Sequence, residues 1–454
     1  MMEWIGEPPA SMPDPVKVAP AADDEPLAPG GVLPLASPPE VTGQPPDRMF
    51  ERLLRRAPDA LRLPTFRLYL AGLGPLSLGT WMQLVALGYL TLQVTGSVTA
   101  VGLVGAADGI PAVLLSLPAG AAADHFPRRR VLVVATSALG LTSLGLALAA
   151  GLGQASLPVL VGAAICFGAA DAFNAPTRQA LVADLVPREQ LVGAATLTSS
   201  VGSAARIIGP AAGGLLLGTL GAASCFLAMA ASAVPFLLVL GRGGWPSAMR
   251  PTTEFGAVHR MLEGLAWSRQ DKAVRAVLLG SVTLGVFGIG YMPYLPVFAR
   301  EQLHGGGQVL GIMYSVGGIG ALLGGVTLSV VSRRLRRDRL LLGAAPLYGL
   351  SLFGLTRAPT LALAIPCLAG ISLGFMAANT AMLTTLQTAA PTMMRARVLS
   401  LYSLAFTAGG PLGTLLYAAL SHIVPLFTAI AAGAVVVGSV LLWSATRPAL
   451  SALG

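Results

Sequence analysis

Charged residues are scarce in this chain of 454 residues, and their scarcity excludes most water-soluble folds. Lys, Arg, Asp and Glu together make up 11% of the sequence, whereas 54% of the residues are hydrophobic. A soluble domain carries about 25% charged residues. Most of the chain is therefore expected to face hydrocarbon, and its length accommodates about twelve spans of ~20 apolar residues with short loops.

Lysine is the rarest charged residue: the sequence has only Lys17 and Lys272. Neither lies in a Gly-x-x-x-x-Gly-Lys-Ser/Thr loop, which argues against ATP-driven activity of this chain alone. The four histidines are isolated, and hydrolase motifs of the His-Glu-x-x-His or Gly-x-Ser-x-Gly kind are absent, so we do not expect an enzyme. Cys166, Cys225 and Cys367 lack metal-ligand spacing, which predicts buried free thiols and neither a metal nor a cofactor.

The net charge of +9 could suggest nucleic acid, but its distribution argues against that partner. The basic residues form short clusters between apolar runs, without a basic stripe or an aromatic platform. The runs are long and often hydrophobic all round, which is typical of helices surrounded by lipid or by one another. The predicted spans are 65–92, 97–120, 131–152, 156–177, 191–219, 222–241, 274–298, 308–331, 339–357, 360–386, 397–419 and 423–445.

Arginine placement predicts how the spans cross the membrane. With the amino terminus inside, every Lys and Arg that flanks a span lies on the cytoplasmic side except Arg300 and Arg357. This asymmetry is what the positive-inside rule requires. It predicts an even number of spans, a multi-pass protein of the inner (plasma) membrane, and cytoplasmic termini at both ends.

Composition divides the chain into five parts. Residues 1–60 are rich in proline, alanine and acidic residues, which predicts a disordered cytoplasmic tail. A charged segment, 242–273, predicts a cytoplasmic linker with a short amphipathic helix. It separates an N-terminal six-helix bundle, 61–241, from a C-terminal one, 274–447, and residues 448–454 form a second tail.

The two predicted bundles resemble each other, because several landmarks recur roughly 200 residues apart, as in a duplicated six-helix unit. The alternative is coincidence in a chain with 55 glycines and 34 prolines. We therefore expect an all-α membrane protein with twelve transmembrane helices in two pseudo-symmetric bundles. The landmarks are Asn174 and Asn379, Pro187 and Pro391, and Gly209-Pro210 and Gly410-Pro411.

The loop after the second span resembles the Gly-x-x-x-Asp-Arg-x-Gly-Arg-Arg loop of the major facilitator superfamily. In that family the loop latches the two halves on the cytoplasmic side, and its carboxylate suits the positive end of a facing helix. His125 and Pro127 depart from the family pattern, which would weaken the latch. The alternative is an ordinary basic turn. The matching residues are Gly120, Asp124, Arg128 and Arg129.

The fifth span contains Gly-Pro-Ala-Ala-Gly-Gly, which resembles the Gly-Pro-x-x-Gly-Gly element of exporters in that superfamily. Proline removes a backbone hydrogen bond and bends the helix, and glycine lets a neighbouring helix approach closely. The resemblance implies a seam or hinge on the outer side, and generic close packing is the alternative. The residues are Gly209, Pro210, Gly213 and Gly214.

Further segments resemble the bacterial efflux branch that includes the enterobactin exporter, and the likeness covers about residues 64–447. The similar segments are Gly79–Gln83, Ala172–Ala180, Asp184–Arg188 and Arg395–Val398. The resemblance implies the major facilitator fold and the export of a siderophore, drug or other natural product by alternating access. It also implies polar contacts between the halves through Arg178, Arg395 and Arg397.

Three charged residues lie at bilayer depth, well inside predicted spans, where a charge is costly and points to function. They are Asp108, Asp171 and Arg206. One aspartate could gain and lose a proton as its surroundings change, which would couple export to proton entry. The alternative is a static ion pair. Asp108 is expected at a depth in the membrane closer to that of Arg206 than Asp171 is, so it is the preferred partner of Arg206. Ala164 stands where many proton-coupled exporters of the superfamily carry an arginine.

Polar residues in other spans could line an amphipathic cavity, or each could bond a neighbouring helix. They are Gln83, Asn174, Tyr291, Asn379 and Gln387. The expected partners are a small-molecule substrate, protons and the lipid bilayer, and the chain is expected to be monomeric. The remaining alternatives are a facilitator or importer of the same fold without proton coupling, and a polytopic membrane enzyme or scaffold.

Overall fold

The computed structural model separates the chain into two units, Met1–Met49 and Phe50–Gly454, and the described residues all belong to the second unit. The predicted tails 1–60 and 448–454 therefore lie almost wholly outside the described residues. The description covers residues 59–242, 245, 257–331 and 337–447.

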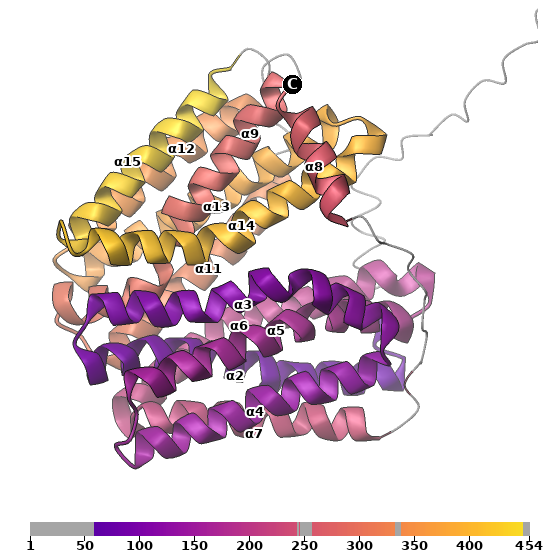
Figure 1. Ribbon diagram of the computed structural model, residues 1–454, viewed down its shortest axis with the longest axis vertical. Helices are drawn as coiled ribbons and strands as arrows, with labels where there is room; N and C mark the ends of the chain where they lie inside the picture. The colour runs from indigo at the N-terminus through magenta and orange to yellow at the C-terminus, as the bar shows by residue number, and fades with distance from the viewer. Residues whose placement is uncertain (1–58, 243–244, 246–256, 332–336, 448–454) are drawn as a thin grey trace, which may run out of the picture. The chain divides into compact units, whose positions relative to one another are not determined.

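Six long helices, α2 to α7, form the N-terminal bundle (Figure 1). Pro64 occupies the first turn of α2, where its missing N–H costs nothing. Gly96 ends that helix with a φ of 60°, and the Ser97 hydroxyl caps α3 by accepting from Ala100 N at 3.3 Å. The helices are α2 (Pro64–Thr95), α3 (Val98–His125), α4 (Arg128–Gly151), α5 (Leu157–Leu185), α6 (Leu191–Leu220) and α7 (Ala222–Gly241), with a short turn η1 (Arg188–Gln190) before α6.

The C-terminal bundle follows a linking helix, α8 (Ala257–Ser268), and begins with an irregular segment. Its later helices match the first bundle in length, because α5 and α13 both have 29 residues and α7 and α15 both have 20. The irregular segment comprises α9 (Lys272–Thr283), η2 (Leu284–Ile289), η3 (Met292–Tyr294), α10 (Leu295–Val297) and η4 (Phe298–Gln302). The later helices are α11 (Gly307–Val331), α12 (Arg337–Leu355), α13 (Leu361–Ala389), α14 (Thr392–Leu420) and α15 (Leu426–Ala445).

Eleven helical segments in the described part of the chain are long and apolar enough to cross a membrane. The predicted span 339–357 corresponds to α12, which is not among the eleven. The described part of α12 starts with three charged residues, Arg337, Asp338 and Arg339. The prediction of an all-α membrane protein is confirmed, and the count of twelve crossings stays a prediction.

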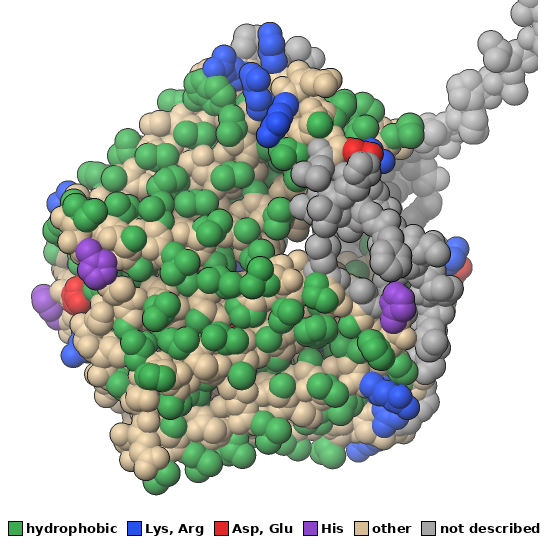
Figure 2. Space-filling model, in the orientation of Figure 1, with side chains coloured by type: hydrophobic (Ala, Val, Ile, Leu, Met, Phe, Trp, Pro, Cys, Tyr) green, Lys and Arg blue, Asp and Glu red, His purple; other side chains and the backbone are tan. Residues whose placement is uncertain are grey.

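The surface of the helices is strongly apolar, as Figure 2 shows by the hydrophobic side chains spread over both bundles. Leu114 and Leu350 are more than two thirds exposed. Exposure of this kind on long helices marks the surface that meets lipid. Cys225 is buried as predicted, but Cys166 is exposed, and that prediction was wrong. Since apolar residues surround Cys166 on every side of α5, hydropathy does not show which side of the helix packs inward there.

Hydroxyl groups from neighbouring helices bind backbone carbonyls of the irregular segment. Tyr417 donates to the carbonyl of Phe287 at 2.8 Å, and Tyr348 donates to that of Gly288 at 2.6 Å. A broken helix is tolerated inside a membrane where side chains satisfy the freed backbone groups in this way. Thr414 and Tyr314 act likewise on Gly290 and Met292, at 3.2 and 3.1 Å.

The bundles meet along two equivalent seams, α6 with α11 and α3 with α14. We define the arginine-rich end as the end where α2, α4, α6 and α14 begin, and the arginine-poor end as the opposite one. Most of the closest approaches lie toward the arginine-poor end. A Cβ at Gly214 would come within 2.6 Å of Gly311 Cα, and one at Gly102 would meet Ala418 Cβ at 2.8 Å.

Candidate functional site

A cavity of about 230 Å³ lies where the two bundles meet, and both contribute to its wall. Its lining is mostly apolar, and Asp108 is its single charged residue. The N-terminal bundle supplies Trp81, Leu84, Leu87, Gly88, Val101, Val104, Gly105, Asp108 and Gly109, and the C-terminal bundle supplies Ile289, Met292, Pro293, Tyr314, Gly410, Pro411 and Thr414.

Glycine and proline close this cavity on the side of the arginine-poor end. A Cβ at Gly105 would come within 2.8 Å of Pro293 Cβ, and one at Gly88 within 3.0 Å of Pro296 Cγ. Side-chain-free positions therefore let α2 and α3 touch the irregular segment directly. Gly109 makes the same kind of approach to Pro411, the proline of the motif repeated in α14.

Asp108 and Asp171 lie on neighbouring helices, α3 and α5, that pack in direct backbone contact. A Cβ at Gly168 of α5 would overlap the backbone carbonyl of Asp108. Asp171 lies three residues after Gly168, on the same helix face, and is within electrostatic range of Asp108. The structure thus brings the two predicted carboxylates together, with Asp108 half-buried and Asp171 exposed.

Arg206 lies on α6 with its guanidinium carbon 5.3 Å from the centre of the Trp81 ring, a cation–π distance. Among the described residues it makes no ion pair with Asp108 or Asp171, so the pair that depth favoured is not formed in this structure. Because Trp81 lines the cavity, Arg206 reaches the same site through an aromatic ring rather than through a carboxylate.

The Gly-Pro-x-x-Gly-Gly element packs α6 against two helices at once. Gly209 and Gly213 face α2, because a Cβ there would lie 2.7 Å from Trp81 Cβ and 3.0 Å from Met82 Cα. Pro210 and Gly214 face α11 on the other side, where both approach Gly311. The element therefore belongs to the seam between the bundles.

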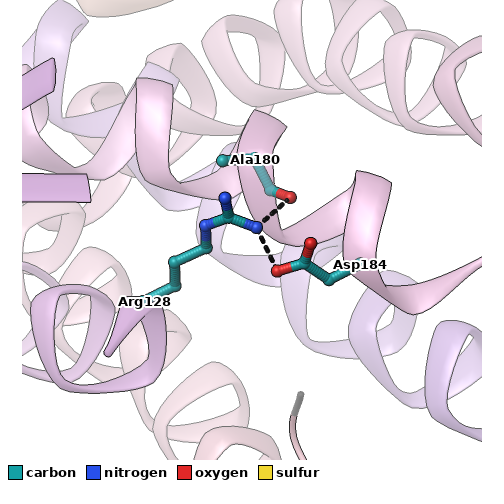
Figure 3. Close-up of polar contacts among 3 residues, drawn as sticks. All are labelled: Arg128, Ala180 and Asp184. Carbon is teal, nitrogen blue, oxygen red and sulfur yellow. Dashed lines mark hydrogen bonds and ion pairs between the residues drawn. The ribbon is translucent and has the colours of Figure 1, made fainter. Parts of the chain in front are cut away.

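The loop between α3 and α4 binds within the N-terminal bundle. Arg128 forms an ion pair with Asp184 and donates to the carbonyl of Ala180 at 3.0 Å, both near the end of α5 (Figure 3). Arg129 donates to the carbonyl of Leu240 at 2.6 Å, near the end of α7. Gly120 has open space beside it, and the Asp124 side chain lies outside the described residues.

Two predicted lining residues, Gln83 and Asn174, lie inside the N-terminal bundle instead of at the cavity. Gln83 is buried and accepts from the Ser143 hydroxyl at 3.4 Å. The Asn174 amide donates to the Thr136 hydroxyl at 3.0 Å, while its own oxygen has no hydrogen-bond partner. Their polar groups connect α4 to α2 and to α5.

The predicted lining residues of the C-terminal bundle also lie outside the cavity wall. Tyr291 is buried in the irregular segment, and Asn379 accepts a hydrogen bond from Tyr402 between α13 and α14. Gln387 is exposed near the arginine-rich end of α13. Apart from Asp108 and the landmark Gly410-Pro411, much of the cavity wall comes from residues that sequence reasoning did not select, notably Pro293 and Thr414.

Helical spacing was a signal that could have found part of this wall, in α2 as in α3 and α14. Trp81, Leu84 and Gly88 lie three and seven residues apart and so share a helix face. Selecting by polarity led to Gln83, which points to another face of the same helix. On the C-terminal side Gly410, Pro411 and Thr414 of α14 also share a helix face, but the irregular segment gives no periodic signal because its helical pitch changes several times.

Among the described residues, no polar contact of the three arginines predicted to join the halves connects the two bundles, and that prediction stays untested. Arg397 forms an ion pair with Glu263 of α8 at 2.6 Å, and the Arg395 side chain is exposed. Arg178 lines a second, partly open cavity of about 410 Å³ on the N-terminal bundle, between α2, α5 and α6.

The sequence matches a family model described as a transmembrane secretion effector over residues 57–452. Among the curated proteins similar to it is the enterobactin exporter EntS of Escherichia coli, which is 27% identical over 82% of this chain and 88% of the relative. The multidrug efflux pump Tap of Mycolicibacterium fortuitum is 27% identical over 74% and 84%. The staphyloferrin A transporter of Staphylococcus aureus is 25% identical over 62% and 70%.

Solved structures with the same fold include a bacterial homologue of the iron transporter ferroportin in an inward-facing state, with a TM-score of 0.66, 16% identity and coverage of 85% and 99% of the two chains. The nucleoside transporter NupG has a TM-score of 0.65, 16% identity and coverage of 86% and 98%. At these identities the likeness shows the fold alone. Together with the family match over almost the whole helical region, it means that this multi-pass membrane protein belongs to the transmembrane secretion effectors of the major facilitator superfamily, which are transporters and not enzymes.

Proposed function

We propose that this chain is a secondary active transporter of the plasma membrane that exports a small amphipathic molecule by alternating access. The family description concerns secretion, and the relatives are named for siderophore transport or export and for multidrug efflux. The substrate is therefore a siderophore, a drug or another natural product. A cavity shared by two bundles suits alternating access, because it can open to either side as the bundles tilt. The chain works as a monomer in this proposal.

The arginine-rich end faces the cytoplasm in this proposal, in agreement with the positive-inside rule. The seams toward the arginine-poor end then close the outer side, so the structure represents an inward-facing conformation. Single cysteines in a chain without native cysteines test the orientation. An impermeant thiol reagent added to intact cells should label Arg357→Cys and leave Arg188→Cys unlabelled. Labelling of Arg188→Cys alone, or of both, would reject this orientation.

Asp108 is the proposed proton carrier, and its place in the shared cavity is the observation that supports it. A carboxylate that exchanges apolar surroundings for water during a conformational change also changes its affinity for protons. Asp171 on α5 lies within electrostatic range of Asp108, so the two residues form a pair of carboxylates. Proton entry along this pair would drive the substrate out.

Inverted membrane vesicles test proton coupling directly. Substrate uptake into them should need a proton gradient and should fall to the passive level when a protonophore is added. Asp108→Asn should fold and reach the membrane but lose gradient-driven uptake, while Asp171→Asn should keep part of it. If the protonophore leaves uptake unchanged, proton antiport is wrong.

A facilitator without proton coupling is the second candidate, and one observation favours it. Ala164 stands where many proton-coupled exporters of the superfamily carry an arginine, and in this chain it is a fully buried residue of α5. A facilitator would equilibrate its substrate in the same vesicles and would not concentrate it. Accumulation above the external concentration would reject this candidate.

A further inference from the structure

The second cavity, of about 410 Å³, has several polar groups in a wall that is otherwise apolar. It lies between α2, α5 and α6 and is lined by residues of the N-terminal bundle alone. Its polar lining includes hydroxyl, amide and guanidinium groups and no carboxylate. These polar residues are Tyr69, Ser77, Arg178, Gln179, Thr198 and Ser199.

Two hydrogen-bond donors of this cavity have no acceptor in the part of the chain that the structure describes. Tyr69 is 0% exposed, and its hydroxyl has no hydrogen-bond partner. Among the described residues, the Arg178 side chain makes no hydrogen bond or ion pair, although it lies within electrostatic range of Tyr69. A donor as buried as the Tyr69 hydroxyl is costly to leave without an acceptor, and the half-buried Arg178 adds an unpaired positive charge beside it. The two groups converge on a space that lacks the acceptor they require.

The cavity lies on the side of the bundle that the seam between the bundles leaves uncovered. Arg178 is seven residues before the end of α5, which places it roughly 10 Å from the arginine-rich end at 1.5 Å per residue. On α6 the cavity is lined by Ala195, Thr198, Ser199 and Gly202, whereas close approaches of this helix to α11 begin at Arg206. A solute arriving from the arginine-rich end therefore meets this cavity before the seam.

We propose that this cavity is a recognition site for an anionic group, a carboxylate, on the transported solute. Arg178 supplies the positive charge and a planar pair of N–H donors, which match a carboxylate. The Tyr69 hydroxyl donates a further hydrogen bond. A volume near 400 Å³ suits the charged head of a larger amphipathic molecule. The proposal rests on the proposed transport function and narrows its substrate class to carboxylate-bearing molecules.

Benzoate and benzamide form a matched pair of probes, because they have the same shape and differ in charge. Thermal unfolding of the purified full-length protein in detergent is followed as each compound is added. A ligand that binds the folded state raises the unfolding temperature in a saturable way. We expect benzoate to do so and benzamide to have no effect. Equal shifts with both compounds, or none with either, would overturn the proposal.

Substitutions locate the binding within the cavity. Arg178→Gln should weaken benzoate binding roughly 10- to 100-fold, as expected for a lost charged hydrogen bond. Tyr69→Phe should weaken it several-fold, and Arg178→Lys should retain part of it if the glutamine variant does not fold. Arg395→Gln, an exposed arginine at the same end, is the control and should bind normally. Unchanged binding in both Arg178 variants would overturn the proposal.

The binding assay separates this site from the proposed function. If Arg178 served only to join the two bundles, its variants would alter transport in vesicles and leave benzoate binding intact, which would overturn the site. If the protein exports its substrate but does not bind benzoate, the proposed carboxylate site is wrong and the proposed transport function remains. Normal benzoate binding in a protein that moves no solute would overturn the transport function instead.

Discussion

The two bundles share one architecture but use polar groups in opposite ways. In the N-terminal bundle the helices are continuous, and Asp108, Asp171, Arg178 and Arg206 lie within them with no ion pair among the described residues. In the C-terminal bundle the interiors of the predicted spans carry no charge, and hydroxyl groups such as that of Tyr348 bind backbone carbonyls of the irregular segment.

The difference shows that the two copies of a duplicated six-helix unit can use their polar groups for different purposes. Several hydroxyl groups of the C-terminal bundle bind backbone carbonyls of the irregular segment, and such contacts stabilise a helix that departs from regular geometry inside the membrane. Regular helices need no such help, so ionisable side chains of the N-terminal bundle remain available for protons or solute. Four substitutions test this contrast, from the largest expected effect to the smallest.

Arg128→Met tests a place where the N-terminal bundle does use charge for structure. Arg128 and Asp184 are about one tenth exposed, so removal of the arginine leaves a buried carboxylate without its partner. We expect a loss of about 3–5 kcal/mol in the free energy of unfolding, measured by denaturant titration in detergent. The double variant Arg128→Met/Asp184→Leu should recover much of it. Arg188→Met at an exposed site is the control, and an equal loss there would contradict the buried pair.

Tyr348→Phe tests the opposite use of polar groups in the C-terminal bundle. It removes the hydrogen bond to the Gly288 carbonyl while keeping the ring, so a buried acceptor is left unsatisfied. The free energy of unfolding should fall by about 1–3 kcal/mol. Tyr89→Phe is the matched control, since Tyr89 makes no described hydrogen bond, and it should be nearly neutral. If the two variants lower the free energy of unfolding equally, the hydrogen bond of Tyr348 has no special role and the proposed difference between the bundles is wrong.

Gly214→Ala tests the seam that joins the bundles. Its added Cβ would face backbone atoms of Gly307 and Gly311 at 2.7 and 2.6 Å, which cannot move aside as a flexible side chain does. The closed seam should be destabilised by about 1–3 kcal/mol, which favours opening at the arginine-poor end. Spin-label distances across α6 and α11 should lengthen there. Gly325→Ala on α11, where a Cβ meets open space, should leave them unchanged; lengthening in both would disprove the explanation.

Glu263→Gln should have the smallest effect of the four. Its ion pair with Arg397 joins α8 to α14, but the two side chains are 38% and 27% exposed. Solvent screens such a pair, so the expected change in the free energy of unfolding is about 0.2–1 kcal/mol. Added salt should reduce that difference further. A loss comparable to that of Arg128→Met would show that the linking helix contributes to the stability of the bundle.

The candidate site was only partly predictable from the sequence. Asp108 was recognised because an acidic residue in an apolar run is unusual whatever its neighbours, and it does line the shared cavity. Gln83 and Asn174 looked equally suited by polarity, yet each bonds a neighbouring helix. A helix turns by 100° per residue, so a polar side chain in an all-apolar helix can face any neighbour.

The sequence by itself determined that the chain is helical and bound to a membrane, because hydrocarbon tolerates only backbones that satisfy their own hydrogen bonds and the apolar runs have the length for it. Its motifs also indicated the superfamily before any coordinates were considered. The tertiary structure alone decided which helix faces meet: that Asp108 faces Asp171 across Gly168, that Arg206 lies over Trp81, and that Tyr69 and Arg178 share a cavity. These pairings depend on close packing between residues far apart in the chain, and hydropathy carries no information about that packing.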